Sequence, residues 1–151
     1  MRQDQVNSGS ILVVNAGSSS LKFSLFRRDA ADALQPALRG QIDGIGTRPH
    51  LHAKDDAGQI LVERELAVEQ IHNVGDAIKL ASVWLRDHLP GEPLLAVGHR
   101  VVHGGADFSQ PVRVDDSVLA ALEMLVPLAP LHQPHNLAAI RVLRETLAPV
   151  P

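Results

Sequence analysis

The first third of the chain alternates apolar and polar residues, a pattern typical of β-strands. Residues 11–14 form a short apolar run, and residues 21–26 (LKFSLF) place an apolar side chain at every second position. Because successive strand side chains point to opposite faces of a sheet, Ser20, Lys22 and Ser24 are expected to share one face. The pattern predicts two strands that are joined by a serine-rich turn.

Three more strands are predicted before the pattern changes. Residues 38–45 give a weaker strand because three glycines interrupt it. Residues 50–54 and 59–66 flank the tripeptide Asp-Ala-Gly, which is a common composition for the turn of a hairpin. The first half of the chain therefore predicts a run of antiparallel strands.

The second half is dominated by helical spacing. Apolar residues recur every three or four positions from 74 to 89, with Asn73 as the cap and Pro90 as the stop. A second helix is expected to follow residues 115–116 and to end at Pro127, and a third to run from about 134–136 to 147. Between the first and second helices, residues 94–102 predict a strand that is covered on both faces. Strands followed by alternating helix and strand indicate an α/β fold.

Composition narrows the class of protein without identifying it. The 151 residues carry a net charge of −3, which argues against a nucleic-acid or acidic-membrane binder, and contain no cysteine. No apolar run reaches the roughly 18 residues of a membrane span. We therefore expect a soluble cytoplasmic protein with a disordered tail over residues 1–10 and a single domain over 11–151.

The turn between the first two strands has the composition of a phosphate-binding loop. Gly17 is expected to let the backbone turn where a side chain would clash, and the loop N–H groups could then converge on an anion. Ser18 and Ser20 add hydroxyl donors, Lys22 adds a positive charge, and Asn15 adds a side-chain oxygen that suits Mg²⁺. A serine-rich hairpin whose lysine only reaches solvent is the alternative interpretation.

Two later segments could hold an acyl or phosphoryl group. Arg100 lies in a predicted strand, where a guanidinium needs a partner; it could bind a carboxylate or acyl phosphate, or one of the 17 acidic residues of the chain. Val102, two residues further on, could line an apolar slot beside it. Leu131 could extend this slot, and His132 could donate a hydrogen bond to a phosphoryl oxygen. The alternative is that the prolines of this segment only bound a helix and its leucines pack in the core.

Together, three segments resemble the acetate kinase family. They are NAGSSSLK (residues 15–22), GHRVVHGG (98–105) and LAPLHQPHN (128–136), and they occur in the order in which the family carries them. The resemblance runs from about residue 11 to residue 147. It implies a ribonuclease H-like mixed sheet with flanking helices, the first half of the fold shared by actin, heat-shock ATPases and sugar kinases.

The resemblance also implies a reaction and a role for each matching residue. The reaction is reversible phosphoryl transfer between ATP and acetate, which gives acetyl phosphate and ADP. Asn15 would contribute to the Mg²⁺ site, and Ser18, Ser20 and Lys22 would approach the phosphates of ATP or ADP. Arg100 would bind the carboxylate or acyl phosphate and His132 would lie near it as a second catalytic residue. The pocket for the substrate methyl group would be formed by Val102 and Leu131.

The sequence departs from the family pattern in two respects, and these leave other functions open. Gln133 stands where the family more often has asparagine. The chain also stops before the segment that carries a catalytic aspartate in the family, so we expect the N-terminal part of an acetate kinase, inactive alone, whose full-length form is a homodimer. A propionate or butyrate kinase and a non-catalytic phosphate-binding half are the alternatives.

The uncovered strand edge left by the truncation is expected to cause self-association.

Overall fold

A single mixed sheet with helices on one face forms most of the molecule. The computed structural model describes residues 8–151. The six strands are β1 (Gly9–Ala16), β2 (Leu21–Arg28), β3 (Leu34–Asp43), β4 (His50–Asp55), β5 (Ile60–Glu65) and β6 (Leu94–His99). The helices are α1 (Val74–His88), α2 (Asp116–Glu123) and α3 (Gln133–Leu147), with short 3-10 turns at Val68–Gln70 and Val126–Leu128. The predicted α/β class is confirmed.

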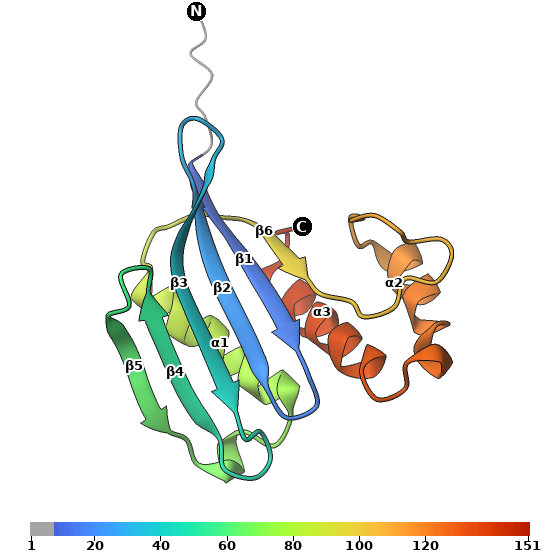
Figure 1. The fold of residues 1–151 in the computed structure, drawn as a ribbon, viewed down its shortest axis with the longest axis horizontal. Coiled ribbons are helices and arrows are strands. Elements are labelled where there is room, and N and C mark those ends of the chain that lie inside the picture. Colours follow the sequence, from blue (N-terminus) through green and yellow to red (C-terminus); the bar gives the residue numbers. More distant parts are fainter. Residues whose placement is uncertain (1–7) are drawn as a thin grey trace, which may run out of the picture.

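The strands are arranged in the order β5-β4-β3-β2-β1-β6. The first five form an antiparallel meander, whereas β6 returns beside β1 and runs parallel to it. Figure 1 shows α1 and α3 behind this sheet, while its other face is left uncovered. A parallel pair needs a crossover connection, and the chain reaches β6 beside β1 by passing from β5 through α1. The carboxyl ends of β1 and β6 therefore meet at one edge of the molecule.

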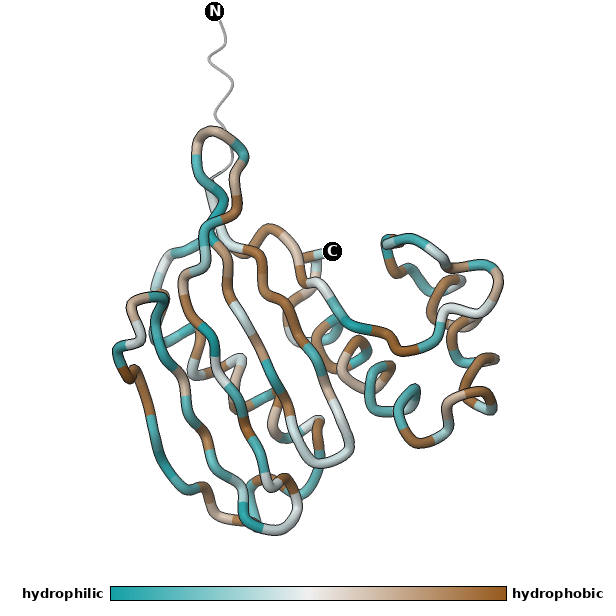
Figure 2. Tube along the Cα trace, in the orientation of Figure 1, coloured by the Kyte–Doolittle hydropathy of each residue, from teal (hydrophilic) through white to brown (hydrophobic). Residues whose placement is uncertain are grey.

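The alternation in β2 decides which face of the sheet is buried. Leu21, Phe23 and Leu25 are buried in the main core against the helices, whereas Lys22 is exposed on the open face. Brown and teal alternate along the strands in Figure 2, as a half-buried sheet requires. The predicted face of Lys22 is confirmed.

Helix α1 follows the predicted boundaries closely. Asn73 caps it, since its side chain accepts a hydrogen bond from the backbone N–H of Asp76 at 3.0 Å. Apolar residues at helical spacing, including Ile78, Ala81 and Leu85, are buried against the sheet. Among residues 8–151, no helix combines the length and the apolar character that a membrane crossing needs.

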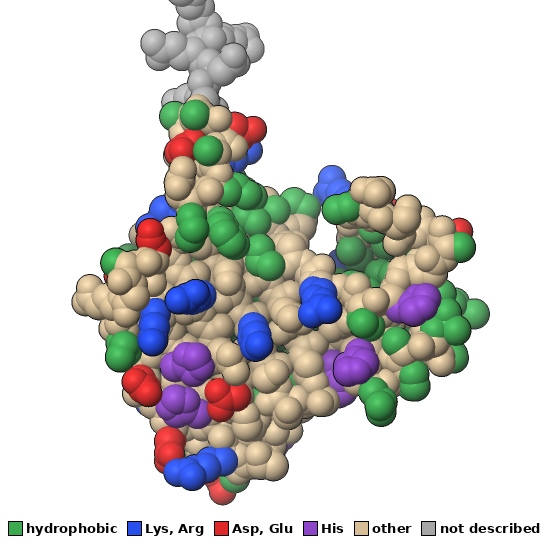
Figure 3. Space-filling model, in the orientation of Figure 1, with side chains coloured by type: hydrophobic (Ala, Val, Ile, Leu, Met, Phe, Trp, Pro, Cys, Tyr) green, Lys and Arg blue, Asp and Glu red, His purple; other side chains and the backbone are tan. Residues whose placement is uncertain are grey.

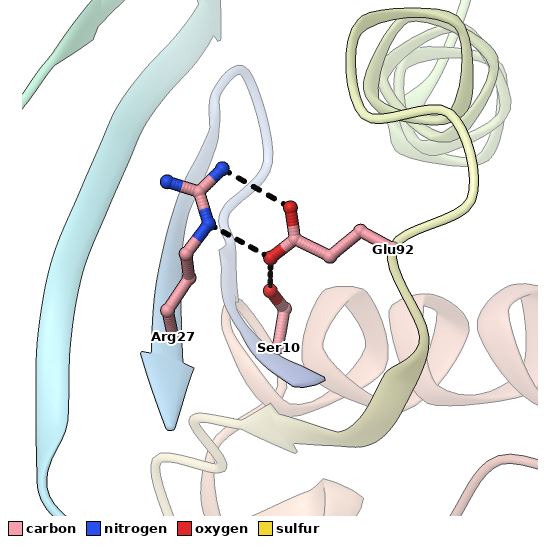
Figure 4. A network of polar contacts seen from close by, with 3 residues as sticks. All are labelled: Ser10, Arg27 and Glu92. Atoms are coloured by element: carbon pink, nitrogen blue, oxygen red, sulfur yellow. Dashed lines mark hydrogen bonds and ion pairs between the residues drawn. The ribbon is translucent and has the colours of Figure 1, made fainter. Parts of the chain in front are cut away.

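Strand β1 begins earlier than predicted. The expected tail covers residues 1–10, of which 1–7 lie outside the described residues, but Gly9 and Ser10 are buried members of β1. Ser10 donates its hydroxyl to Glu92, and Arg27 donates to the same carboxylate from Nε and Nη2 at 3.0 Å each (Figure 4). The Arg27 guanidinium lowers the pKa of the Glu92 carboxyl. This network joins β1 and β2 to the turn before β6.

The end of β6 and its environment differ from the prediction. The strand stops at His99 rather than residue 102, and its residues are half-buried because β6 lies at the edge of the sheet. Helix α2 likewise ends at Glu123, before a separate turn that contains Pro127. Beyond residue 100 the backbone binds side chains of α3 instead of a neighbouring strand. Competition from these polar side chains ends the strand.

A hollow separates β6 from the region around α2. Helix α2 packs with one side of α3 in a second apolar cluster that contains Leu119, Leu122, Leu137 and Ile140. A cavity of about 930 Å³ lies between this cluster, the loop over residues 108–115 and β6. Figure 3 shows the hollow between the sheet and the α2 region. The outer edge of β6 therefore faces this cavity, and among residues 8–151 it pairs there with Pro151, whose carbonyl accepts the N–H of Val97.

We expect this edge to make the chain self-associate. An accessible strand edge presents backbone donors and acceptors that a second chain can pair with. Light scattering at increasing concentration should show oligomers, and Leu95→Lys, which adds a charge to β6, should reduce them. The same lysine substitution at the exposed Val83 of α1, which adds the charge away from both sheet edges, is the control. A monomer at high concentration would contradict the prediction.

Candidate active site

The serine-rich connection between β1 and β2 is a tight loop held from two sides. The N–H of Gly17 donates to the carbonyl of Ser20 at 2.8 Å, and the N–H of Ile45 donates to the carbonyl of Ser19 at 3.0 Å. Ser18 and Ser19 are exposed, and Ser20 is half-buried. The loop therefore presents hydroxyl groups to solvent from a fixed backbone.

Gly17 does not have the role that the sequence suggested. A Cβ placed on Gly17 would meet only Ser20, with 3.6 Å to its hydroxyl oxygen, which is an ordinary contact. Its φ is also outside the left-handed region. The backbone turn therefore tolerates a side chain here, and the expected clash is wrong.

Three predicted site residues occupy adjacent positions on β2, on β1 and directly after β6. Asn15 of β1 lies opposite Lys22 of β2 in the antiparallel register. On the other side of β1, Val14 is the partner of His99, and the N–H of Arg100 donates to the carbonyl of Val14 at 3.1 Å. Lys22, Asn15 and Arg100 therefore form a row, which we call the Lys22–Arg100 row, beside the serine loop.

The Lys22–Arg100 row carries two available cations. Lys22 and Arg100 are both exposed, and neither forms an ion pair with another residue in the part of the chain that the structure describes. An internal salt bridge of Arg100, the alternative drawn from the sequence, is therefore wrong for the described residues. Two unpaired cations beside a loop of hydroxyl donors favour binding of a polyvalent anion.

The remaining predicted residues lie on two segments that hydrogen bonds hold together. The N–H of Val102 donates to the side chain of Asn136 at 3.0 Å, and the N–H of His103 donates to Gln133 at 3.3 Å. Leu131 and His132 come directly before Gln133 and are both exposed. His132 precedes α3 without using its side chain as a cap, so its imidazole is available to a ligand. The segment that contains Val102 is therefore held against the start of α3, which His132 directly precedes.

This surface is open. The side chain of Leu131 is 74% exposed and that of Val102 is 43% exposed. The 930 Å³ cavity is lined by His99 and Val101 but not by Arg100 or Val102. None of Lys22, Arg100, Val102, Leu131 and His132 is among the residues that line the large cavity, so that cavity is a different feature.

Two buried amides were missed as site residues. Gln133 is 0% exposed and Asn136 is 5% exposed, and both bind backbone groups of the segment after β6. Their spacing of three residues puts them on one face of α3. That spacing, directly after a proline-rich connection, is the signal that could have identified them. Gln133, noted only as a departure from the family pattern, ties His103 to the helix.

His99, the last residue of β6, is half-buried and lines the cavity. Its Nδ1 has no hydrogen-bond partner among the described residues, and burial lowers its pKa to about 4. An unfolded histidine titrates near pH 6.5. Between these two values the unfolded chain binds a proton that the folded chain does not, so stability falls as the pH decreases. Above pH 6.5 both states are neutral and His99 adds no pH dependence.

His99→Gln should therefore remove part of the acid sensitivity. We expect the free energy of unfolding of the original chain to fall by up to about 1.4 kcal/mol per pH unit between pH 6 and 4.5 owing to this group. Urea unfolding at several pH values should give a shallower slope for the variant. The exposed His72 provides the control, since His72→Gln should keep the original slope. An unchanged slope in His99→Gln would contradict the assignment.

The chain is similar to acetate kinases over nearly its whole length. The family model described as the acetokinase family matches residues 10–151. The acetate kinase of Nitrobacter hamburgensis is 49% identical over 142 residues, which are 94% of this chain and 35% of that protein. The acetate kinase of Rhizobium meliloti is 48% identical, with 93% and 35% covered. The chain thus spans about a third of the length of these relatives.

Solved structures give the same result for the fold. The crystal structure of Porphyromonas gingivalis acetate kinase superimposes with a TM-score of 0.81 at 30% identity, covering 94% of this chain and 35% of that one. A propionate kinase from Francisella tularensis gives 0.81 at 29% identity, with 95% and 35% covered. The expected first part of an acetate kinase-like fold is confirmed. By its sequence and its sheet, the chain belongs to the acetokinase family.

Proposed function

We propose that this chain supplies the phosphate- and acyl-binding wall of an acetate kinase. The observation that carries the proposal is the Lys22–Arg100 row, in which two unpaired cations flank Asn15 beside the serine loop. In the reaction, a carboxylate oxygen of acetate forms a bond to the γ-phosphorus of ATP. The bond from that phosphorus to the β,γ-bridging oxygen breaks, which gives acetyl phosphate and ADP.

The chemistry of this transfer suits cations better than a general base. Acetate is already ionised near neutral pH, so no group has to remove a proton from it. The difficulty is that two anions must approach each other while charge spreads over the phosphoryl oxygens. Positively charged groups that are fixed beside the reacting atoms reduce this repulsion. Lys22 would act on the nucleotide phosphates, and Arg100 on the carboxylate or acyl phosphate.

The other residues would provide donors and shape. Ser18 and Ser20 would donate hydroxyl hydrogen bonds to phosphate oxygens, and His132 would donate one to the transferred phosphoryl group. Val102 and Leu131 would contact the methyl group of acetate. The exposure of both side chains supports this role, since apolar groups that a substrate will cover remain accessible in its absence.

The described residues suit Mg²⁺ only as an ion that arrives with the nucleotide. No group of three or more histidine, cysteine or acidic side chains in residues 8–151 could hold a metal ion. Mg²⁺ in kinases keeps several waters and binds substrate phosphates together with one or two protein oxygens. The side-chain oxygen of Asn15, half-buried at the end of β1, would be such a ligand. The bound ion would neutralise phosphate charge.

Calorimetric titration of the chain with acetyl phosphate, MgATP and MgADP tests the proposal. We expect binding without turnover, because in-line transfer needs groups on both sides of the substrate and the described site is a single wall. Turnover would indicate a complete enzyme. Absence of binding to all three ligands would contradict the proposal.

A propionate kinase is the second candidate. The Francisella tularensis propionate kinase superimposes as well as the acetate kinase does, and Val102 and Leu131 leave the acyl side open. One methylene group changes binding by only about 1–3 kcal/mol in an apolar pocket. Competition between acetyl phosphate and propionyl phosphate for the chain separates the two, since tighter propionyl phosphate binding would overturn the acetate assignment.

Location and assembly of the full-length protein stay predictions. We infer a cytoplasmic enzyme that acts on small anions, binds neither nucleic acid nor membrane, and forms a homodimer. Sedimentation of the full-length protein would test the dimer, and a monomer at micromolar concentration would contradict it.

A further inference from the structure

One buried side chain connects the two parts of the proposed site. Asn136 lies in the first turn of α3 and donates from Nδ2 to the carbonyl of Ala16 at 2.8 Å. Its Oδ1 accepts a hydrogen bond from the N–H of Val102 at 3.0 Å. Ala16 is the last residue of β1, immediately before the serine loop. A single side-chain amide therefore connects the end of β1, beside the serine loop, to the segment that carries Arg100 and Val102.

The geometry requires an amide at this position. One end of the side chain must donate and the other must accept, and both bonds are shielded from water because Asn136 is only 5% exposed. A buried backbone group that loses its partner destabilises the structure, so both backbone segments are held firmly. No other side chain in the described range 8–151 has a hydrogen bond to both of these segments.

We propose that Asn136 is a positioning residue that fixes the serine loop relative to the segment carrying Arg100 and Val102. It touches neither proposed ligand and acts through the backbone of Ala16 and Val102. The identity of the two ligands rests on the proposed function, but the claim that Asn136 fixes the two segments relative to each other does not. By linkage, an anion bound at the serine loop would then affect the affinity of an acyl phosphate at Arg100, and the reverse.

Asn136→Asp separates the two halves of this bridge. A carboxylate still accepts the hydrogen bond from Val102, but it has no donor for Ala16 and places negative charge beside that carbonyl oxygen. Gln133→Glu is the matched control, since Gln133 is equally buried and makes the same kind of contact. Its Nε2 donates to the carbonyl of His103 at 3.0 Å and to that of Leu122 at 3.3 Å.

The effect of each substitution on the two segments is measured by amide hydrogen exchange in the ligand-free chain. In Asn136→Asp the N–H of Gly17, which closes the serine loop, should exchange about tenfold faster, while that of Val102 stays protected. In Gln133→Glu the N–H of Gly17 should keep its original rate. Equal acceleration throughout the molecule in both variants would mean a purely structural role and would overturn the proposal, as would no change at Gly17.

The unmodified chain offers a second test if a variant fails to fold. Scalar couplings across hydrogen bonds should be detectable by NMR from Asn136 Nδ2 to the carbonyl carbon of Ala16, and from the Val102 amide nitrogen to the side-chain carbonyl carbon of Asn136. Absence of both, with couplings seen in the sheet, would overturn the bridge. Neither test contains a ligand, so failure of acetyl phosphate to bind would contradict the proposed function alone.

Discussion

Replacing Arg100 with alanine is expected to lower the affinity for acetyl phosphate by about 100- to 1,000-fold. Arg100 is exposed at the end of β6 and forms no ion pair with another described residue, so its guanidinium is free to make two parallel hydrogen bonds to the ligand. Hydrogen bonds to charged groups contribute about 1.5–3 kcal/mol each, and two bonds near the lower limit of this range correspond to the expected change. Because no internal carboxylate loses a partner, the free energy of unfolding should change little.

Calorimetric titration of Arg100→Ala with acetyl phosphate measures this effect. Arg39→Ala is the matched control, since Arg39 is also exposed but lies on β3 opposite Ser24, outside the Lys22–Arg100 row. Arg39→Ala should bind acetyl phosphate almost as tightly as the original chain, because it removes only one positive charge from the surface and no contact with the ligand. Equal losses in the two variants would show that net charge rather than the Lys22–Arg100 row binds the ligand.

Phe23→Ala should cause a large loss of stability, about 3–5 kcal/mol. Phe23 is 3% exposed in the centre of β2, and its ring lies 6.2 Å from that of Trp84 of α1. It also covers Gly40 of β3, where an added Cβ would come within 2.3 Å of the ring. Its removal opens a cavity between sheet and helix that neither can easily fill. Urea unfolding should show a lower midpoint with a similar slope.

Phe26 of the same strand is the control for this prediction. It is half-buried and is not a member of the main core cluster. Phe26→Ala should therefore cost less than half as much as Phe23→Ala. If the two variants unfold at the same urea concentration, the core does not lie on the helix-covered face.

The strand pattern could be predicted because each strand of the meander has one buried face. In β2 the two-residue period alone assigns Lys22 to the open face and Phe23 to the core. The register could not be predicted in the same way. That Asn15 lies opposite Lys22 depends on the length of the loop, and the proximity of Arg100 depends on a parallel crossover through α1.

The end of β6 could not be predicted from the local sequence, and for the buried amides the sequence offers only the three-residue spacing of Gln133 and Asn136. Residues 101 and 102 are both valines, which favour a strand, but the N–H of Val102 binds Asn136, 34 positions away. Tertiary hydrogen bonds of this kind override local propensity. Gln133 and Asn136 are polar residues that carry no charge, and only the fold shows that both are buried.

The most direct test of the central claim is NMR of the chain with ADP and Mn²⁺, a paramagnetic substitute for Mg²⁺. If the serine loop and the Lys22–Arg100 row bind a metal-bound polyphosphate, amide signals of residues 15–22 and of Arg100 should broaden first. Those of β4 and β5 should stay sharp. Broadening that begins instead around the cavity beside β6, or that spreads evenly over the chain, would contradict the account.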